Sequence, residues 1–422
     1  MSAVKMNAVK TFFVAVIGLA GVFSMGCGGG SSSPKANVIA KSGQNVTPIV
    51  VNAGPTNNYV NGAFASVTLC VPQTSTCQTI DNMLVDTGSS GLRIVSSVLT
   101  LALPQQKAPS GNPVAECLPF LGSYTWGPVQ TADVQIAGEK AAAAPIQVLS
   151  DSLPNFPVAS ACPNGLPSAD TVANLGANGI LGVGAGAQDC GSYCEQVQTA
   201  NFNLYYECSS SAGCQPVAES LAQQVINPVS LFSSDNNGVI IELPAVSGSA
   251  ASLNGSLVFG IGTQANNALG NATVYTIDST FSFTTSYKGT PYSGSFIDSG
   301  SNGYFVLDST TVPALVDCPQ SSNAPGFYCP ATTQTLSATN QGLNGATGTV
   351  NFSIANAETL FSNPTDTVFS QLGGPSIIPP APGGTSTPPY FDWGLPFFYG
   401  RNIYTAIEGA STPSGKGPYW AY

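Results

Sequence analysis

An internal duplication constrains the fold of this chain more than any other feature of its sequence. Residues 84–95 read LVDTGSSGLRIV, and residues 296–307 read FIDSGSNGYFVL. In both segments two apolar residues precede Asp, Thr or Ser, Gly, Ser, any residue, Gly and a mainly apolar end. A single Asp-Thr-Gly would be weak evidence, because Asp and Gly are ordinary turn residues. Two copies of a twelve-residue pattern predict two copies of one structural unit.

The spacing downstream of the two segments repeats as well. Gly182, in Ile-Leu-Gly, follows Asp86 by 96 residues, and Gly394, in Asp-Trp-Gly-Leu, follows Asp298 by the same 96 residues. Charged residues make up only 7% of the chain, against roughly 25% in an average soluble protein. The abundant Gly, Ser, Thr, Asn and Pro favour short strands joined by turns. We therefore expect two copies of one β-rich lobe.

The predicted organisation has four parts. These are a signal peptide (residues 1–26), a lipid anchor with a flexible tether (27–45), an N-terminal β lobe (46–230) and a C-terminal β lobe (231–422). Within the lobes, strands are expected at residues 47–52, 64–71, 83–85, 239–243, 256–259, 281–285 and 294–297, a hairpin over 122–137, and a Pro- and Gly-rich surface loop over 373–389.

The chain contains no histidine. This absence excludes Ser–His–Asp and Cys–His catalysis and nearly all catalytic zinc sites, so carboxylates must transfer protons if the protein is an enzyme. The formal net charge is −11, and no Lys/Arg cluster offsets it. Such a surface repels phosphate backbones, which excludes nucleic acid as a partner. We expect no metal and no cofactor.

The N-terminus has the features of an export signal. Lys5 and Lys10 precede the apolar residues 12–23, and small residues lead to Cys27. A transmembrane helix is the alternative, but the run is shorter than the ~20 residues that a span needs. The segment resembles a bacterial lipoprotein signal, although Ser24 stands where Leu is usual. That resemblance implies cleavage before Cys27, lipidation of its thiol and, because Gly28 follows, sorting to the outer membrane.

The other ten cysteines predict disulfides, since an even number is typical of an oxidising compartment. Their sequence proximity predicts the pairs Cys70–Cys77, Cys208–Cys214 and Cys318–Cys329. Three pairings remain open for Cys117, Cys162, Cys190 and Cys194. A metal site is the alternative for Cys190-x-x-x-Cys194, and the absence of histidine disfavours it.

Several motifs together resemble the pepsin-like aspartic proteases. They are the two duplicated segments, NGILGVG at residues 178–184, LVFGIG at 257–262 and FFYGRNIYTAI at 397–407. The combination is most similar to uncharacterised bacterial lipoproteins of this type. The resemblance implies an all-β, bilobal pepsin-like acid protease fold with two pseudo-symmetric β lobes.

The same resemblance implies a catalytic pair, Asp86 and Asp298. Two carboxyl groups about 3 Å apart cannot both ionise, so they share a proton and can serve as base and acid. The alternative is that both aspartates only cap turns. The implied supporting residues are Thr87 and Ser299, which would lock the two loops together, Gly88 and Gly300, which would admit backbone amides, and Ser89 and Ser301, which would bind the outer carboxylate oxygens.

Two positions depart from the family pattern. Pro119 stands where active members carry a Tyr in the flap, the hairpin that covers the cleft, and Phe120, Tyr124 and Trp126 are the candidate replacements. Arg93 stands where the family often has Trp. A charge facing the two aspartates would oppose proton sharing, so we expect Arg93 to point to solvent or to pair elsewhere.

These features support an aspartic-type endopeptidase-like lipoprotein that acts on extended peptides at acid pH. The alternative is a catalytically silent binding lipoprotein of the cell envelope. A glycosidase is disfavoured, because its two acids stand at least ~5 Å apart and need no duplicated loop. The expected partner is an extended peptide or an envelope protein. Contact with the membrane is expected only through the lipid anchor, with the protein monomeric and located at the outer membrane.

Overall fold

The computed structural model describes residues 38–162, 165–198, 203–209, 211–376 and 390–422. The predicted signal peptide, the lipidation site Cys27 and the tether as far as residue 37 lie outside the described residues, as does most of the predicted loop over 373–389. All described residues belong to one compact unit, Ala36–Tyr422. Among them, no helix combines the length and apolar character that crossing a membrane requires.

The described chain is built almost entirely of strands. Those of its first half are β1 (Val46–Asn52), β2 (Gly62–Cys70), β3 (Cys77–Asp86), β4 (Ser90–Val95), β5 (Val114–Pro119), β6 (Tyr124–Ile136), β7 (Glu139–Leu149), β8 (Gly179–Val183), β9 (Tyr205–Ser209) and β10 (Gly213–Pro216). The helical turns there are η1 (Ser96–Val98), α1 (Val172–Leu175), η2 (Gly191–Glu195) and η3 (Pro228–Leu231).

The second half has the same character. Its strands are β11 (Gly238–Leu243), β12 (Ser249–Ala250), β13 (Leu253–Phe259), β14 (Val274–Thr276), β15 (Phe283–Tyr287), β16 (Thr290–Ile297), β17 (Tyr304–Phe305), β18 (Gln334–Gln341), β19 (Thr347–Ile354), β20 (Val368–Phe369), β21 (Gly373–Gly374), β22 (Asp392–Trp393), β23 (Arg401–Ala406), β24 (Ser411–Thr412), β25 (Gly415–Lys416) and β26 (Tyr419–Ala421). Its helical turns are α2 (Ala357–Leu360) and η4 (Leu395–Phe398).

The two halves contain the same four-stranded arrangement. In the first half β3 pairs in parallel with β8, β8 pairs antiparallel with β4, and β4 pairs in parallel with β7. In the second half β16, β22, β17 and β21 repeat this order with the same three directions. The predicted all-β, bilobal pepsin-like fold with two pseudo-symmetric lobes is confirmed by this topology.

The equal spacing of Gly182 and Gly394 has a steric cause. A Cβ atom at Gly182 would lie 2.7 Å from the Gly91 carbonyl oxygen, and one at Gly394 would lie 2.1 Å from the Gly303 carbonyl oxygen. At both places the crossing strand touches the backbone of the duplicated segment. Each lobe therefore requires glycine at the same point.

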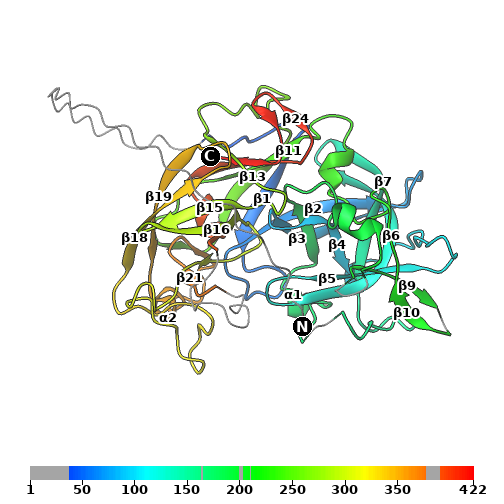
Figure 1. The fold of residues 1–422 in the computed structure, drawn as a ribbon, viewed down its shortest axis with the longest axis horizontal. Coiled ribbons are helices and arrows are strands. Elements are labelled where there is room, and N and C mark those ends of the chain that lie inside the picture. The colour runs from blue at the N-terminus through cyan, green and yellow to red at the C-terminus, as the bar shows by residue number, and fades with distance from the viewer. Residues whose placement is uncertain (1–37, 163–164, 199–202, 210, 377–389) are drawn as a thin grey trace, which may run out of the picture. The chain divides into compact units, whose positions relative to one another are not determined.

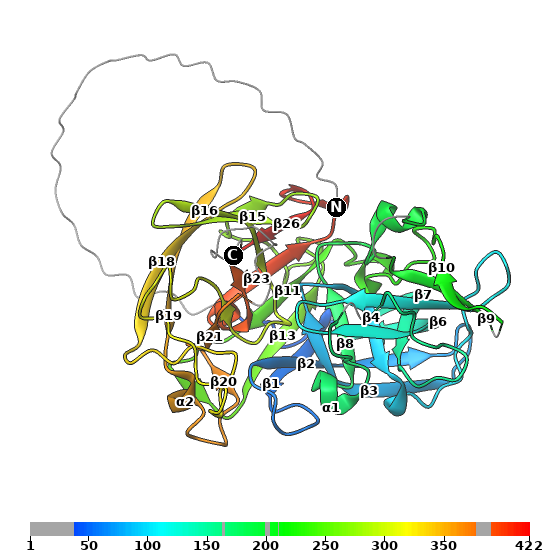
Figure 2. The same cartoon turned by 60° about the horizontal axis from the view of Figure 1, so that its bottom comes forward.

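A shared antiparallel sheet joins the halves. Its strands run in the order β1, β13, β11, β23, β26 and β14, and β1 also pairs with β2. In Figures 1 and 2, β1, β11 and β13 lie between the strands β2–β9 on one side and β15–β21 on the other. The largest buried apolar cluster draws on both halves, from Ile49 to Trp420.

The structure corrects three sequence predictions. Residues 122–137 do not form a hairpin: β6 is a single long strand that pairs first with β5 and then with β7. The predicted tether ends too late, because the backbone amide of Ala40 donates to Glu242 and the buried Asn45 donates to the Phe259 carbonyl oxygen. Part of the predicted surface loop, Gly373–Gly374, is the buried strand β21.

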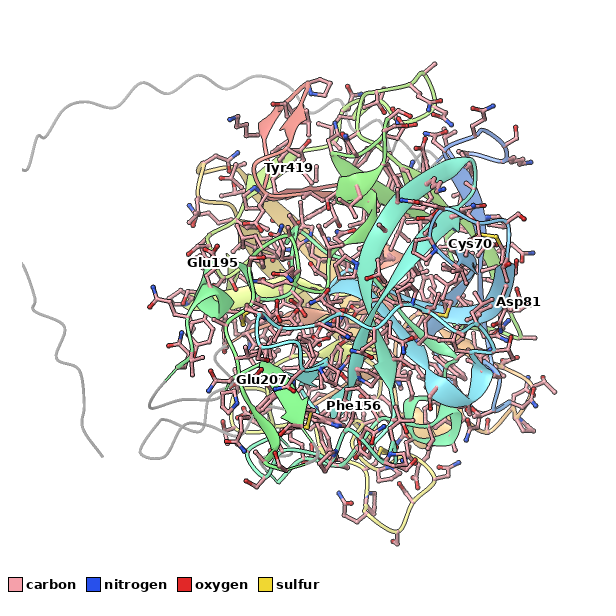
Figure 3. All side chains as sticks on the ribbon, turned by 90° about the vertical axis from the view of Figure 1, so that its right-hand side faces the viewer. Cys70, Asp81, Phe156, Glu195, Glu207 and Tyr419 are labelled. Carbon is pink, nitrogen blue, oxygen red and sulfur yellow. A yellow bond between two sulfur atoms is a disulfide. The ribbon has the colours of Figure 1, made fainter. Side chains whose placement is uncertain are left out.

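Five disulfides are present among the described residues. The predicted pairs Cys70–Cys77, Cys208–Cys214 and Cys318–Cys329 are confirmed. The open pairings resolve as Cys117–Cys162 and Cys190–Cys194, and the second of these replaces the metal-site alternative. Figure 3 labels Cys70, beside which a disulfide is drawn in yellow.

Candidate active site

The two duplicated segments bring Asp86 and Asp298 together. Asp86 is the last residue of β3, Asp298 follows β16 directly, and both are buried. A Cβ atom at Gly300 would lie 2.7 Å from Asp86 Oδ1 and 3.1 Å from Asp298 Oδ1, and one at Gly88 would lie 2.7 Å from both carboxyl oxygens of Asp298. Only glycine leaves room for two facing carboxyl groups at this place.

Each aspartate accepts hydrogen bonds from a backbone amide and a serine hydroxyl at equivalent positions of its own loop. The Gly88 amide donates to Asp86 Oδ1 over 2.7 Å, and the Gly300 amide donates to Asp298 Oδ1 over 2.7 Å. The Ser89 hydroxyl donates to Asp86 Oδ2, and the Ser301 hydroxyl lies 2.9 Å from Asp298 Oδ2. The Asp86 and Asp298 carboxyls therefore have matching surroundings on their own loops.

The loops are also tied to each other. The Thr87 amide donates to Ser299 Oγ over 3.1 Å, and the Ser299 amide donates to Thr87 Oγ1 over 2.9 Å. Each hydroxyl in turn donates across the junction, Thr87 to the Ile297 carbonyl and Ser299 to the Val85 carbonyl. All six residues expected to support the aspartates thus lie beside them.

The electrostatics of the pair are unequal. Burial raises the pKa of Asp298 well above its usual range, and the nearby carboxyls of Asp86 and Asp392 raise it further, whereas the Gly300 amide opposes the shift. Two interacting carboxyls release their protons as a pair. When the pair is half-ionised, the two carboxyls therefore share one proton, and the surroundings of Asp298 favour its neutral form.

Two adjoining cavities open at the aspartates. The larger has a volume of about 670 Å³ and the smaller about 270 Å³. Both are lined by Asp86, Asp298, Phe120 and Leu121. Because both cavities meet at the carboxyls, the cleft has room for groups that flank a reacting bond.

The turn between β5 and β6 covers this cleft. Phe120 lies on the turn and contacts both cavities. The other two flap candidates point elsewhere: the Tyr124 hydroxyl donates to Asp151, and the buried Trp126 donates from Nε1 to the Phe156 carbonyl over 2.9 Å. Of the three predicted residues, only Phe120 lies at the aspartates.

Arg93 is fully buried beneath this turn. Its guanidinium lies 2.7 Å from Glu116 on β5 and 3.0 Å from Asp189, and it stands 6.0 Å from the centre of the Phe120 ring. The expectation that Arg93 points to solvent or pairs elsewhere is confirmed in its second form, because Arg93 pairs with Glu116 and Asp189. Burial first and Glu116 second raise the pKa of Asp189, against the lowering effect of Arg93.

Sequence reasoning missed two residues beside the pair. Tyr59 lines the smaller cavity, and burial together with the charges of both aspartates raises its pKa. The second is Asp392, which lies 2.6 Å from the Ser301 hydroxyl. The sequence contains one signal for it: Asp392 stands two residues before Gly394, just as Ile180 stands two residues before Gly182 in the first half.

No group of three or more His, Cys, Asp or Glu side chains within the described ranges is arranged to hold a metal ion. The facing carboxyl groups of Asp86 and Asp298 can supply acid–base chemistry, with one acting as a base and the other as an acid.

Comparison with known proteins gives a family and a solved structure of similar topology. No curated protein matches the chain. Among solved structures, the aspartic proteinase from Irpex lacteus is similar at 14% identity, with a TM-score of 0.49, over 89% of this chain and 96% of that chain. Residues 41–422 match the family described as "Protein of unknown function (DUF3443)". Since this match covers far more than half of its length, the chain belongs to the DUF3443 family.

Proposed function

We propose that the protein is an aspartic-type endopeptidase that cleaves extended peptides. One observation carries the proposal: Asp86 and Asp298 face each other with matching donors where two cavities meet. A turn-capping role would not require the crosswise Thr87–Ser299 bonds, which fix the two loops against each other.

The unequal surroundings of the pair assign the roles. Asp86 is the base: its carboxylate takes a proton from water as the water oxygen bonds to the peptide carbonyl carbon. Asp298 is the acid, and its proton passes to the carbonyl oxygen to give a neutral tetrahedral diol. Asp86 then protonates the amide nitrogen as the carbon–nitrogen bond breaks, while Asp298 recovers a proton from a diol hydroxyl.

The lining of the cleft favours the binding of peptides that carry apolar side chains. The larger cavity is lined mainly by apolar and aromatic side chains, among them Leu118, Phe120, Leu121, Phe281, Phe296 and Trp420. Its ionisable lining residues are the carboxyls of Asp86, Asp189 and Asp298. Acidic peptides would be repelled from such a cleft.

We also propose that the protein works outside the cytoplasm, as a monomeric lipoprotein of the outer membrane held by lipid on Cys27. The five disulfides support an oxidising compartment. Labelling of growing cells with an alkyne fatty acid would test the anchor, and a Cys27→Ser variant that still carries the label would contradict it.

A catalytically silent binding protein is the second candidate. The observation that favours it is the covering turn, where Phe120 supplies a ring but no hydroxyl and the nearby Tyr124 hydroxyl is engaged by Asp151. Such a protein would hold a peptide in the same cleft without cleaving it.

Incubation of the mature protein with denatured casein from about pH 3 to about pH 7 separates the two candidates. An endopeptidase should cleave most rapidly at acid pH, and Asp86→Asn, Asp298→Asn and a transition-state inhibitor of aspartic proteases should each abolish cleavage. Asp81→Asn is the matched control, because Asp81 lies on the same strand as Asp86 but is exposed (Figure 3). Cleavage that survives all three perturbations contradicts the mechanism, and peptide binding without cleavage favours the second candidate.

A further inference from the structure

We propose that Asp392 is a third acid of this site, which stays neutral and positions the Ser301 hydroxyl so that it donates to Asp298. This inference deepens the proposed endopeptidase function and rests on it for its catalytic part. Its structural part, a neutral buried acid bonded to Ser301, stands independently of catalysis.

The Ser301 hydroxyl lies between two carboxyl groups. Its oxygen is 2.9 Å from Asp298 Oδ2 and 2.6 Å from Asp392 Oδ2. A hydroxyl carries one hydrogen, so it can donate to only one of two acceptors. The other carboxyl must therefore donate to the hydroxyl oxygen, and to do so it must carry a proton.

The proton of the aspartate pair lies between Asp298 and Asp86, so the surroundings of Asp392 identify it as the acid that donates to Ser301. Its side chain is fully buried, and its Oδ1 atom has no hydrogen-bond partner among the described residues. It lies on β22 directly opposite Phe296 of β16 and Phe305 of β17, and directly opposed residues share a face of the sheet. Ionisation there would bury a carboxylate oxygen without compensation.

The charges that act on Asp392 point the same way. From the facing loops, the titratable groups are Asp86 and Asp298, both of which are acids. Burial raises the pKa of Asp392 well above its usual range, and Asp86 raises it further, against the hydrogen bond from Ser301. The direction of the bonds is then Asp392 to Ser301 and Ser301 to Asp298.

The first half of the molecule lacks this device. Ile180 occupies the position that corresponds to Asp392, and the Ser89 hydroxyl therefore has the Asp86 carboxyl without a competing acid. Asp392 thus introduces an asymmetry into an otherwise duplicated site, and it does so on the side of the acid member.

This asymmetry has a consequence for proton transfer. When Asp298 gives its proton to the carbonyl oxygen, it becomes a carboxylate that the Ser301 hydroxyl stabilises. If Asp392 ionises, the hydroxyl turns toward Asp392 instead, and Asp298 becomes a poorer proton donor. Asp392 is therefore a positioning residue, which acts on the reaction through Ser301.

Two substitutions distinguish this role from simple packing. Asp392→Ile places the residue of the first half at this position and removes the donor, so kcat should fall about tenfold or more with little change in KM. Asp392→Asn retains a donor that does not ionise. The Asn variant should therefore have a kcat much closer to that of the wild type than the Ile variant has, and it should stay active at higher pH than the wild type. Equal pH profiles for Asn and Ile variants would overturn the proposal.

A double-mutant cycle tests whether the effect passes through Ser301. In a Ser301→Ala background, Asp392→Ile should have no further effect on kcat, because the hydroxyl that Asp392 positions is gone. Independent, multiplying losses would overturn the positioning role. Circular dichroism and thermal melting establish that each variant is folded.

Infrared difference spectra supply a readout that does not depend on proteolysis. At neutral pH the wild type should show a carboxylic acid C=O band that Asp392→Asn lacks, whereas Asp81→Asn serves as the control for an exposed substitution. If no substrate is cleaved but this band difference is present, the endopeptidase proposal fails and the neutral Asp392 stands. If the spectra of wild type and Asp392→Asn agree in this band, the neutral acid is overturned whether or not the protein is a protease.

Discussion

Thr87 and Ser299 exchange backbone hydrogen bonds across the junction of the two lobes: the hydroxyl of each accepts the amide of the other, over 2.9 and 3.1 Å. Both residues are almost fully buried. Because each hydroxyl also donates to a carbonyl of the opposite segment, the two loops are connected by four bonds through two side chains. The positions of Asp86 and Asp298 are therefore fixed before any substrate arrives.

Thr87→Ala should weaken this connection. It removes the acceptor of a buried amide and the donor to the Ile297 carbonyl, so the free energy of unfolding should fall by about 1–3 kcal/mol. Chemical denaturation measures the change. Thr87→Ser is the matched control, because Ser299 shows that serine suffices in the other lobe. If Ala and Ser variants are equally stable, the exchanged bonds do not hold the loops.

Removal of Arg93 should cost more stability than removal of any exposed cation. Arg93→Met leaves the buried carboxyls of Glu116 and Asp189 without their guanidinium, so unfolding should become easier by about 3–5 kcal/mol. The control is Lys140→Met: the Lys140 side chain is half-exposed, and the buried Asp133 keeps the Ala143 amide as a donor, so the loss should be at most about 1 kcal/mol. Urea unfolding at neutral pH compares the two. Equal losses would contradict the predicted role of burial.

Glu219 should make stability depend on pH. Burial raises its pKa to about 7 in the folded protein, and its Oε1 atom has no partner in the described structure. A raised pKa means that the folded state binds the proton more tightly, so this contribution is complete below the unfolded pKa and is lost as pH rises toward 7. The slope approaches about 1.4 kcal/mol per pH unit.

Thermal melting of Glu219→Gln between pH 4 and 8 tests this expectation. The variant should lose less stability than the wild type as pH rises, because its amide does not ionise. Glu195→Gln, at an exposed position (Figure 3), is the control and should follow the wild type. Parallel melting curves for wild type and Glu219→Gln would contradict a shifted Glu219. Asp298 and Asp392 contribute a slope of the same sign to all of these proteins.

Phe120 should contribute to peptide binding rather than to folding. Its ring lines both cavities and is only partly buried, so Phe120→Ala should weaken binding of an apolar peptide or inhibitor about tenfold and leave the melting temperature nearly unchanged. Trp126→Phe, which lacks the bond to Phe156 and lies away from the cleft, should change stability but not affinity. Calorimetry on an Asp298→Asn background keeps the ligand intact. Equal affinities for wild type and Phe120→Ala would show that the turn does not contact the ligand.

The sequence predicted those parts of the molecule that depend on contacts between backbones. Gly182 and Gly394 are required wherever a crossing strand touches a duplicated segment, so their spacing predicts the lobes. The pattern around Asp86 and Asp298 likewise reflects turns that admit no Cβ atom. Such requirements leave a trace in the chain that a single sequence can show.

Other features depend on partners that local sequence does not identify. The alternation in residues 124–136 fits one long strand as well as a hairpin, and only pairing with β5 and β7 decides between them. The role of Asp392 could not be predicted, because its burial and its hydrogen bond to Ser301 arise only in the tertiary structure. Arg93 pairs with the carboxyl groups of Glu116 and Asp189, which lie 23 and 96 residues away in the chain.

The position of β1 determines where the molecule would resist force. Residues 46–51 pair with β13 of the second half, while residues 50–52 pair with β2 of the first. A force applied to the chain ahead of β1 therefore shears β1 against β13, and the row of hydrogen bonds between these two strands must break together. If the two halves were expressed separately, each would expose an unpaired strand edge. The second half would lack β1, which pairs with its strand β13 in the whole protein.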